Sequence, residues 1–250
     1  GAFTVVHRCY EKKSRQQYAA RFIRIGRDLG TKEMVFRELE IMHVCQHERL
    51  VTFYEAYDLG SYVVMILEYI PNGELADKIV REDPRMTEED CRQVARQICE
   101  GIGFLHRNSI VHLDLKPENV LCMSSESNDV KLIDFGLARR LDPFAGIRIL
   151  FATPEFCAPE VVNYETVGFP TDMWSIGVIT FVMLSGTSPF LGEDDDETLT
   201  NVSDASWDFQ EDCWENISFE AKDLITRLLV KAKDGRLTIE DALRHPWIQV

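Results

Sequence analysis

Three side chains of different chemistry lie close together in the sequence, at Asp114, Lys116 and Asn119. The carboxylate can accept a proton from a hydroxyl, the ammonium can neutralise charge on a moving phosphoryl group, and the carboxamide oxygen can bind magnesium. The apolar residues Val120 and Leu121 follow directly. The residue types and their spacing therefore predict phosphoryl transfer, from a loop just ahead of a short apolar segment.

Residues 112–119 read His-Leu-Asp-Leu-Lys-Pro-Glu-Asn and resemble the catalytic loop of eukaryotic protein kinases. Asp-Phe-Gly at residues 134–136 and Ala-Pro-Glu at residues 158–160 follow in the order and separation of the family's other signatures. A lone Asp-Phe-Gly is a common turn, but the three motifs together indicate a protein kinase. The resemblance implies an α+β, two-lobed protein kinase fold, with a small antiparallel-sheet N-lobe carrying one helix and a larger, mainly helical C-lobe.

The resemblance also implies roles for individual residues. Asp114, Lys116 and Asn119 would be catalytic, Asn119 and Asp134 would bind Mg2+, and ATP would be the phosphoryl donor. Positions that match the family's nucleotide-binding residues are Gly1, Val6, Ala19, Arg21, Glu38, Leu67, Glu68, Ile70, Glu74, Asn119, Leu121 and Asp134. Backbone groups of the hinge at Glu68 and Ile70 would bind adenine. For Glu74, an ordinary first-turn glutamate favoured by the helix dipole is an equal alternative.

The resemblance covers one kinase domain over residues 1–250, with the N-lobe at about 1–69, the hinge at about 68–72 and the C-lobe at about 73–250. Residues 1–6 resemble the tail of the family's glycine-rich loop, so the first part of that loop is expected to be missing from the chain. Thr4 stands at the usual third glycine, and a side chain there limits how closely the backbone can approach phosphates. Ala152 stands for another usual glycine.

The most serious departure is Arg21, which replaces the strand lysine that contacts the α- and β-phosphates. Arginine keeps the charge, but its longer, planar fork does not place a single ammonium between Glu38 and two phosphate oxygens. A second hypothesis is therefore a pseudokinase or scaffold domain that binds partners with weak or no phosphotransfer. Arg21, Thr4 and Ala152 favour it, whereas the intact catalytic loop opposes it.

Hydrophobic periodicity predicts the elements that position these residues. The predicted strands are residues 3–9, 17–24, 50–57, 62–69 and 130–133, and the predicted helices are residues 31–44, a long helix from Thr87, residues 172–184, 218–230 and 238–243. The first two strands read as a hairpin, and the N-lobe sheet is expected to have about five strands. Thr87 and Asp90 match a capping box. The acidic run at residues 193–197 reads first as a solvated helix start and second as a contact for a basic substrate.

Other matches concern the framework of the C-lobe. Glu160 and Arg236 resemble the family's buried ion pair, and Asp172 resembles the aspartate that anchors the catalytic loop. Thr153 matches a threonine that hydrogen-bonds the catalytic loop in serine/threonine kinases, which favours an aliphatic hydroxyl as acceptor. These residues are expected to be structural.

The expected mode of control follows from Leu113, which replaces the arginine that usually binds a phosphate group on the activation segment. Residues 137–152 contain no serine, threonine or tyrosine. A leucine at this place is characteristic of the myosin light-chain kinase, titin and twitchin group within the calmodulin-dependent kinases. This resemblance implies a myosin light chain or another cytoskeletal or muscle protein as substrate, an autoinhibitory tail and calmodulin outside this chain, and a cytoplasmic location at the sarcomere or cytoskeleton.

Composition limits the partners. The net charge of −15 argues against nucleic acid and anionic membranes and favours a basic protein substrate, and no apolar run is long enough to span a membrane. The seven cysteines are scattered without a Cys-x-x-Cys pair, which fits free thiols in a reducing compartment. His43, Cys45 and His47 have ligand-like spacing, but a buried thiol with histidines at a helix end is favoured over a metal site.

Overall fold

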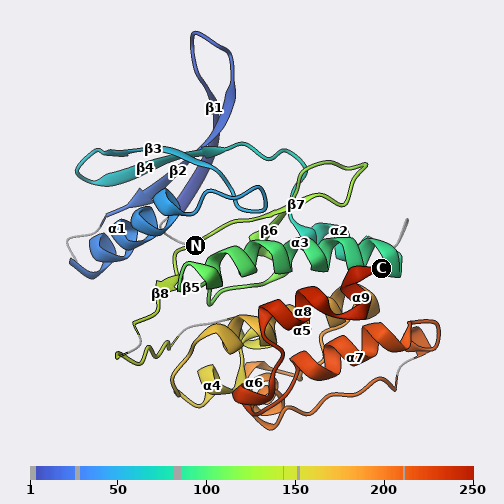
Figure 1. The fold of residues 1–250 in the computed structure, drawn as a ribbon. Coiled ribbons are helices and arrows are strands. Elements are labelled where there is room, and N and C mark those ends of the chain that lie inside the picture. Colours follow the sequence, from blue (N-terminus) through green and yellow to red (C-terminus); the bar gives the residue numbers. More distant parts are fainter. Residues whose placement is uncertain (1–3, 26–28, 82–85, 143, 151–152, 211) are drawn as a thin grey trace.

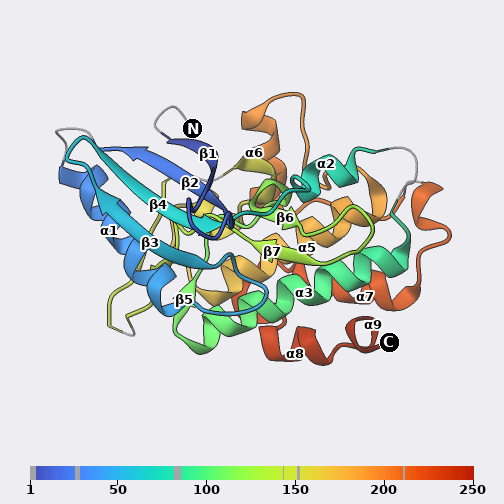
Figure 2. The same cartoon turned by 90° about the horizontal axis from the view of Figure 1, so that it is seen from above.

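A computed structural model describes residues 4–25, 29–81, 86–142, 144–150, 153–210 and 212–250. It has the two lobes expected of a protein kinase fold (Figure 1): a twisted sheet with one long helix lies above a larger body of helices. Figure 2 shows from above how the strands spread over one end of that helical body. The predicted fold class is confirmed.

The N-lobe sheet is antiparallel and its strand order is β1-β2-β4-β3. The strands are β1 (Thr4–Tyr10), β2 (Gln17–Arg24), β3 (Phe53–Asp58) and β4 (Tyr62–Glu68). The predicted hairpin is therefore confirmed. The expectation of about five strands is wrong for the described residues, which form a four-stranded N-lobe sheet. Before the hinge, the sequence has only four segments with the pattern of a strand. The third strand also begins later than predicted, since Leu50 forms only an isolated bridge with Leu132.

Helix α1 (Leu29–Val44) carries Glu38 and packs on one face of the sheet. Its residues Val35, Ile41 and Met42 are buried, in the same core as Val63 and Met65 of β4. The apolar stripe that the sequence predicts for this helix is too broad, because Met34 and Val44 are 44% and 46% exposed. The predicted stripe comprises Met34, Val35, Leu39, Ile41, Met42 and Val44. Burial of the narrower stripe fixes the rotation of α1 and turns Glu38 toward β2.

The C-lobe contains most of the helices. Its α-helices are α2 (Leu75–Ile79), α3 (Glu88–Arg107), α4 (Pro159–Val162), α5 (Phe169–Ser185), α6 (Asp195–Asp204), α7 (Phe219–Leu228), α8 (Ile239–Arg244) and α9 (Pro246–Gln249). Short 3-10 helices occupy Pro117–Asn119, Pro154–Phe156, Asp212–Trp214 and Lys233–Gly235. Two small antiparallel pairs lie between the lobes: β5 (Ile110–Val111) with β8 (Arg139–Arg140), and β6 (Val120–Cys122) with β7 (Val130–Leu132). None of the described helices combines the length and apolarity needed to cross a membrane.

Helix α3 begins at the predicted capping box. The Thr87 hydroxyl accepts a bond from Asp90 N at 3.2 Å, and the Asp90 carboxylate accepts one from Thr87 N at 2.9 Å. The helical spacing of the sequence predicts that one face of α3 is apolar, and this face is buried: Cys91, Val94, Ile98, Ile102 and Leu105. This face packs the helix into the core, and the helix leads the chain toward the loop that carries Asp114.

Helix α5 forms the centre of the C-lobe and is buried on nearly all sides, as its apolar sequence predicts. Gly177 allows a close approach to the end of α7, since a Cβ at this position would lie 2.9 Å from Leu228 Cβ. Trp174 on the same helix is fully buried and stacks on Phe190. The helix also supplies Asp172 from its first turn, directly below the catalytic loop.

Candidate active site

The buried carboxylate of Asp172 anchors the catalytic loop. It accepts hydrogen bonds from the backbone nitrogens of His112 and Leu113, each at 2.9 Å, and lies 2.9 Å from His106 Nε2. Leu113 has a left-handed φ of 68°, a costly conformation for leucine that these bonds hold in place. The predicted anchoring role of Asp172 is confirmed.

The structure brings together Asp114, Lys116 and Asn119. Asn119 Nδ2 donates to the backbone oxygen of Asp114 at 2.7 Å and to its carboxylate Oδ2 at 2.8 Å. Lys116 Nζ lies 3.3 Å from Asp114 Oδ1 and donates to Thr153 Oγ1 at 3.0 Å. The last bond is the predicted contact of Thr153 with the catalytic loop. The network fixes the Asp114 carboxylate beside a cation, where a hydroxyl could meet both.

Asp134 is delivered next to this network by the end of β7. The backbone nitrogen of Ile133 donates to the backbone oxygen of Asn119 at 2.9 Å, which joins the two loops. Asp134 has a φ of 61°, and its Oδ1 accepts from Gly136 N at 3.2 Å. Because Asn119 uses Nδ2 to hold Asp114, its amide oxygen is the atom left for a cation. The carboxylate and this carbonyl oxygen are hard ligands that fit Mg2+.

Arg21 lies between two carboxylates. Its Nη1 is 2.5 Å from Glu38 Oε1, and its Nη2 is 3.3 Å from Asp134 Oδ1. The pairing with Glu38 follows the family pattern. The reach to Asp134 was not anticipated from the sequence, and it means that the guanidinium is divided between the helix and the predicted magnesium ligand.

The charges of this triad affect one another. Burial works against the charge of Arg21, but Glu38 and Asp134 outweigh it and raise the pKa of the guanidinium. Burial also raises the pKa of Glu38, which is 4% exposed, and Arg21 offsets this only in part. Asp134 loses solvation too, yet Arg21 and the Gly136 backbone hold its pKa below the usual value. Asp134 is therefore ionised near neutral pH, as a metal ligand must be.

The predicted hinge begins at the end of β4, where the side chain of Glu68 makes structural contacts. Glu68 Oε2 accepts bonds from Thr52 N at 3.1 Å, Thr52 Oγ1 at 2.9 Å and Lys131 Nζ at 2.7 Å. Partial burial opposes ionisation of Glu68, but these bonds prevail and lower its pKa. The predicted adenine contacts of Glu68 and Ile70 were assigned to the backbone, which this arrangement leaves unchanged.

The remaining predicted nucleotide-binding residues lie on neighbouring elements of the two lobes. Val6 is opposite Arg21 in the sheet register and is 58% exposed, and Ala19 is opposite Leu67. Glu74 forms a bridge with Leu121 of β6. Their roles in binding ATP stay predictions. Gly1 and Ala152 lie outside the described residues.

The predicted buried ion pair closes the activation segment onto the C-lobe. Arg236 Nη1 and Nη2 each donate to one oxygen of Glu160 at 2.8 Å, and Thr171 Oγ1 donates to Glu160 at 2.9 Å. The Arg236 guanidinium also lies 4.9 Å from the Trp174 ring centroid. Breaking such a buried pair costs about 3–5 kcal/mol. Its role is to hold the segment after Thr153 in place.

Sequence reasoning missed two sets of contacts. Lys131 and Thr52 hold Glu68, and Arg21 holds Asp134, but the paired residues are 63, 16 and 113 positions apart. No short motif contains either set. For Arg21, the signal was the substitution itself, because a forked side chain has a second nitrogen that must find a partner.

The candidate metal cluster around Cys45 has the structural explanation favoured from the sequence. In the part of the chain that the structure describes, no three or more His, Cys, Asp or Glu side chains are grouped so that they could hold a metal ion. Burial raises the pKa of the Cys45 thiol to about 11, and the His47 ring stacks on Phe104 with 4.9 Å between the centroids. The Cys45 side chain is therefore packed as part of the buried core.

The two lobes and the converging catalytic and Asp-Phe-Gly loops define a protein kinase domain. Residues 1–248 match the family described as "Protein kinase domain". The chain belongs to the protein kinase family. Its position within the family follows from its individual relatives.

Among the similar proteins is a titin homolog from Caenorhabditis elegans, 49% identical over 99% of this chain and 1% of that protein. Myosin light chain kinase 3 from Rattus norvegicus is 48% identical over 99% of this chain and 31% of that protein. A solved twitchin kinase region from C. elegans matches with a TM-score of 0.94 and 42% identity, covering 100% of this chain and 44% of the solved chain. The chain thus spans only a minor part of these longer relatives. It resembles the myosin light-chain kinases and the titin and twitchin kinases, as the sequence motifs predicted.

Proposed function

We propose that this domain is a serine/threonine kinase that transfers the γ-phosphoryl group of ATP to a protein hydroxyl, with Arg21 slowing the reaction. The observation that carries the proposal is the contact network of Asp114, Lys116 and Asn119, joined through Ile133 to Asp134. It supplies a proton acceptor, a cation and two metal ligands within one site. Phosphoryl transfer depends mainly on such positioning and charge stabilisation.

Each residue of the network has one role in the transfer. Asp114 orients the attacking hydroxyl and receives its proton as the new P–O bond forms and the bond to ADP breaks. Lys116 neutralises charge on the transferred group, and its bond to Thr153 fixes its position beside Asp114. Asn119 and Asp134 would hold Mg2+, which would offset the negative charge of the phosphates.

The acceptor is proposed to be a serine or threonine in a basic segment. Thr153 supports the aliphatic hydroxyl, since it makes the contact with Lys116 that the serine/threonine kinase pattern predicts. The substrate side of the site is acidic: partial burial together with the charges of Asp77 and Glu118 raises the pKa of Glu74. A carboxyl group in a field of this sign is stabilised by a cationic substrate residue.

The similar proteins suggest the biological setting. Because several of them are myosin light chain kinases and others are titin-like or twitchin kinases, we infer a light chain or another cytoskeletal protein of muscle as substrate. A place in the cytoplasm at the sarcomere or cytoskeleton follows from the same similarity. An autoinhibitory segment and calmodulin, both outside this chain, are the corresponding regulatory partners.

The second candidate function is a pseudokinase domain. It is favoured by one observation, the contact between Arg21 Nη2 and Asp134 Oδ1, because a guanidinium on the metal-binding carboxylate competes with Mg2+. Such a domain would bind partners through its surface and transfer phosphate weakly or not at all. The intact Asp114 network argues for the kinase instead.

A phosphoryl-transfer assay tests the kinase activity and the substrate assignment separately. The domain is incubated with magnesium, ATP and a regulatory myosin light chain, and the modified residue is identified by mass spectrometry. We expect phosphoserine or phosphothreonine next to basic residues, and no product in Asp114→Asn. Phosphotyrosine as the main product would overturn the acceptor assignment. Product on a generic basic peptide but not on a light chain would overturn the substrate and keep the activity.

A further inference from the structure

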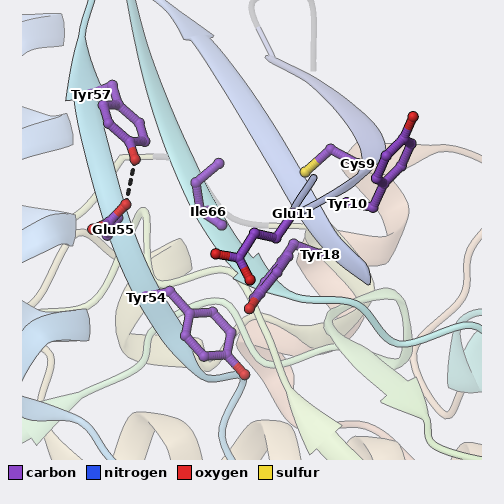
Figure 3. A pocket seen from close by; sticks show the side chains of 8 residues that line it. All are labelled: Cys9, Tyr10, Glu11, Tyr18, Tyr54, Glu55, Tyr57 and Ile66. Carbon is purple, nitrogen blue, oxygen red and sulfur yellow. Dashed lines mark hydrogen bonds between the residues drawn. The ribbon is translucent and has the colours of Figure 1, made fainter. Parts of the chain in front are cut away.

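The face of the N-lobe sheet opposite α1 carries a groove of about 550 Å3, a volume typical of sites for small ligands. We call it the tyrosine groove and define it by Tyr10, Tyr18, Tyr54 and Tyr57 with the carboxylates of Glu11 and Glu55. In Figure 3, Glu11, Tyr18, Tyr54 and Glu55 lie around Ile66, the Tyr57 hydroxyl points toward Glu55, and Tyr10 lies at the edge with its ring turned away from the others. None of them belongs to the catalytic network.

Strand alternation explains why Ile66, Glu55 and Tyr57 share one face. Along β4, Met65 is fully buried in the core, so its neighbour Ile66 points to the other side. Glu55 pairs with Ile66 in the register and Tyr57 pairs with Val64, which places both on that outer side. The register of β3 shifts between Phe53 and Glu55, and this bulge accommodates Tyr54 beside Glu55.

The aromatic rings are accessible to a partner. Tyr10, Tyr54 and Tyr57 are 57%, 48% and 49% exposed. Tyr18 and Tyr54 form an edge-to-face pair with 5.0 Å between centroids, which fixes one wall of the groove. Rings held in this way present their negative faces without losing much conformational freedom on binding.

The groove is also acidic and its carboxylates lack cationic partners. Neither Glu11 nor Glu55 forms an ion pair with any residue in the described part of the chain. Glu55 accepts a hydrogen bond from the Tyr57 hydroxyl, and that bond together with the carboxylate's charge raises the pKa of Tyr57. A carboxylate can accept further bonds, so each keeps capacity for a donor.

A cation contact within the chain indicates which hydrogen-bond donor suits the tyrosine rings of the groove. The guanidinium of Arg15, at the turn of the β1–β2 hairpin, lies 5.3 Å from the ring centroid of Tyr10 at the rim. Among the described contacts, Tyr18, Tyr54 and Tyr57 have no such cation. A planar guanidinium can stack on an aromatic face and donate two parallel bonds to a carboxylate, which an ammonium cannot do.

We propose that the tyrosine groove binds an arginine side chain presented by a basic segment of a partner protein, stacked on Tyr54 and hydrogen-bonded to Glu55. The net charge of −15 draws such a segment toward the domain. This binding is separate from phosphoryl transfer, so it holds whether or not the domain is an active kinase. It would give the domain a second point of contact with a partner, distant from Asp114.

Direct binding of defined peptides tests the proposal. The probe is a fluorescent eight-residue glycine–alanine peptide with two central arginines and no hydroxyl acceptor, compared with lysine and citrulline versions by anisotropy at low salt. We expect the arginine peptide to bind most tightly and the neutral citrulline peptide at least about 10-fold more weakly. Glu55→Gln and Tyr54→Leu should each weaken arginine-peptide binding roughly 5-fold, the size of one exposed cation contact.

Matched controls locate the site. Glu126→Gln removes an exposed carboxylate of the C-lobe, and Tyr62→Leu changes a tyrosine of the same sheet outside the groove lining, so both should bind the arginine peptide as the unmodified domain does. Equal binding of the citrulline peptide would overturn the choice of a cation. Unchanged binding in both groove variants would place the peptide elsewhere. Self-association in sedimentation that Glu55→Gln abolishes would identify a second copy as the occupant and refute the partner assignment.

Discussion

Arg21 holds one nitrogen on Glu38 and the other on Asp134, so its effect extends from the helix to the metal-binding loop. A lysine has one ammonium and cannot span both carboxylates in the same way. The arginine is therefore compatible with an ordered N-lobe, because it maintains the pair with Glu38. In the proposed function it is less compatible with nucleotide binding, because Asp134 would have to exchange a guanidinium for Mg2+.

The first prediction concerns this exchange. Arg21→Lys should tighten magnesium-dependent binding of a fluorescent ATP analogue by roughly 5-fold or more, since it frees Asp134 Oδ1 and restores a compact cation for the phosphates. Titration with and without excess magnesium measures the effect. Asp134→Asn is the control and should bind weakly in either background. Equal affinities for the unmodified domain and Arg21→Lys would show that the site already compensates for the guanidinium of Arg21.

Residues within one contiguous motif were predictable. Asp114, Lys116 and Asn119 meet as expected because the few residues between them form a tight loop whose backbone Asp172 fixes. The contact of Arg21 with Asp134 was not predictable, since it depends on how far a side chain reaches across 113 positions of sequence. Glu38 was predictable only in part. Its position on the helix was expected, but its burial depends on the rotation of α1, which the sequence did not define.

At the scale of elements, the helices of the C-lobe are joined at their ends by polar contacts. Glu88 in the first turn of α3 accepts bonds from Ser218 N at 2.9 Å and from the Ser218 hydroxyl at the start of α7. It also accepts a bond from Trp247 Nε1 of α9 at 2.8 Å. One carboxylate therefore connects three helices far apart in the sequence.

The second prediction follows from that junction. Glu88→Gln should lower the free energy of unfolding by about 1–3 kcal/mol at pH 7, because an amide cannot accept all three bonds as the carboxylate does. Partial burial opposes ionisation of Glu88, but the bonds from Ser218 and Trp247 prevail and lower its pKa. The stabilisation is thus complete above the unfolded value of about 4.3 and is lost as pH falls through the lower folded value.

Urea unfolding of both proteins between pH 7 and pH 3 checks the sign. The two stabilities should converge as the pH falls below about 4. Glu126→Gln, at an exposed site, should behave like the unmodified domain throughout. A difference in stability between the unmodified domain and Glu88→Gln that grows on acidification would contradict the assigned role.

The third prediction concerns the activation segment. Leu113 is buried at 6% exposure where the family has a phosphate-binding arginine, and residues 137–152 contain no hydroxyl group. We therefore expect phosphatase treatment to leave the transfer rate of this domain unchanged, since no charge in that segment can be removed. Rates before and after treatment, with complete dephosphorylation verified by mass spectrometry, measure this. A fall of several-fold would reveal a required phosphate elsewhere.

Element types were more predictable than element limits. The capping box fixed the start of α3 because Thr87 and Asp90 bond each other locally. The later start of β3 was missed because Leu50 and Val51 are apolar and buried, yet they lie against β7 instead of continuing the sheet. The bulge at Tyr54 was missed for a related reason. An extra residue in one strand depends on how that strand pairs with its neighbour, and it is not visible in the alternation of apolar and polar residues.

At the scale of the whole molecule, the net negative charge of the domain affects how a charged substrate approaches it. The chain has a net charge of −15, and Glu74 and Glu118 add a local negative field on the side where we propose that the substrate binds. The acidic residues at the start of α6 cap that helix, as the first interpretation of the run at residues 193–197 predicted. They are also exposed, so they contribute to the field at longer range.

The fourth prediction uses this field. Peptides with arginine and lysine near the acceptor serine should be phosphorylated faster than peptides in which neutral residues replace them. The advantage should shrink as salt is raised from about 0.05 M to about 0.5 M, because the screening length falls below about 10 Å in this range. Rates of the paired peptides across the salt series measure it. A preference that does not respond to salt would indicate shape recognition instead of charge.

The central claim is that this domain transfers phosphate through Asp114 at a rate limited by Arg21. Single-turnover transfer of labelled γ-phosphate to one basic serine peptide tests it most directly, with the unmodified domain, Arg21→Lys and Asp114→Asn compared at saturating magnesium and ATP. We predict slow but measurable transfer by the unmodified domain, a rate at least ~10-fold higher for Arg21→Lys, equivalent to about 1.4 kcal/mol of barrier, and no transfer for Asp114→Asn in either background. Equal rates for the unmodified domain and Asp114→Asn would contradict the claim.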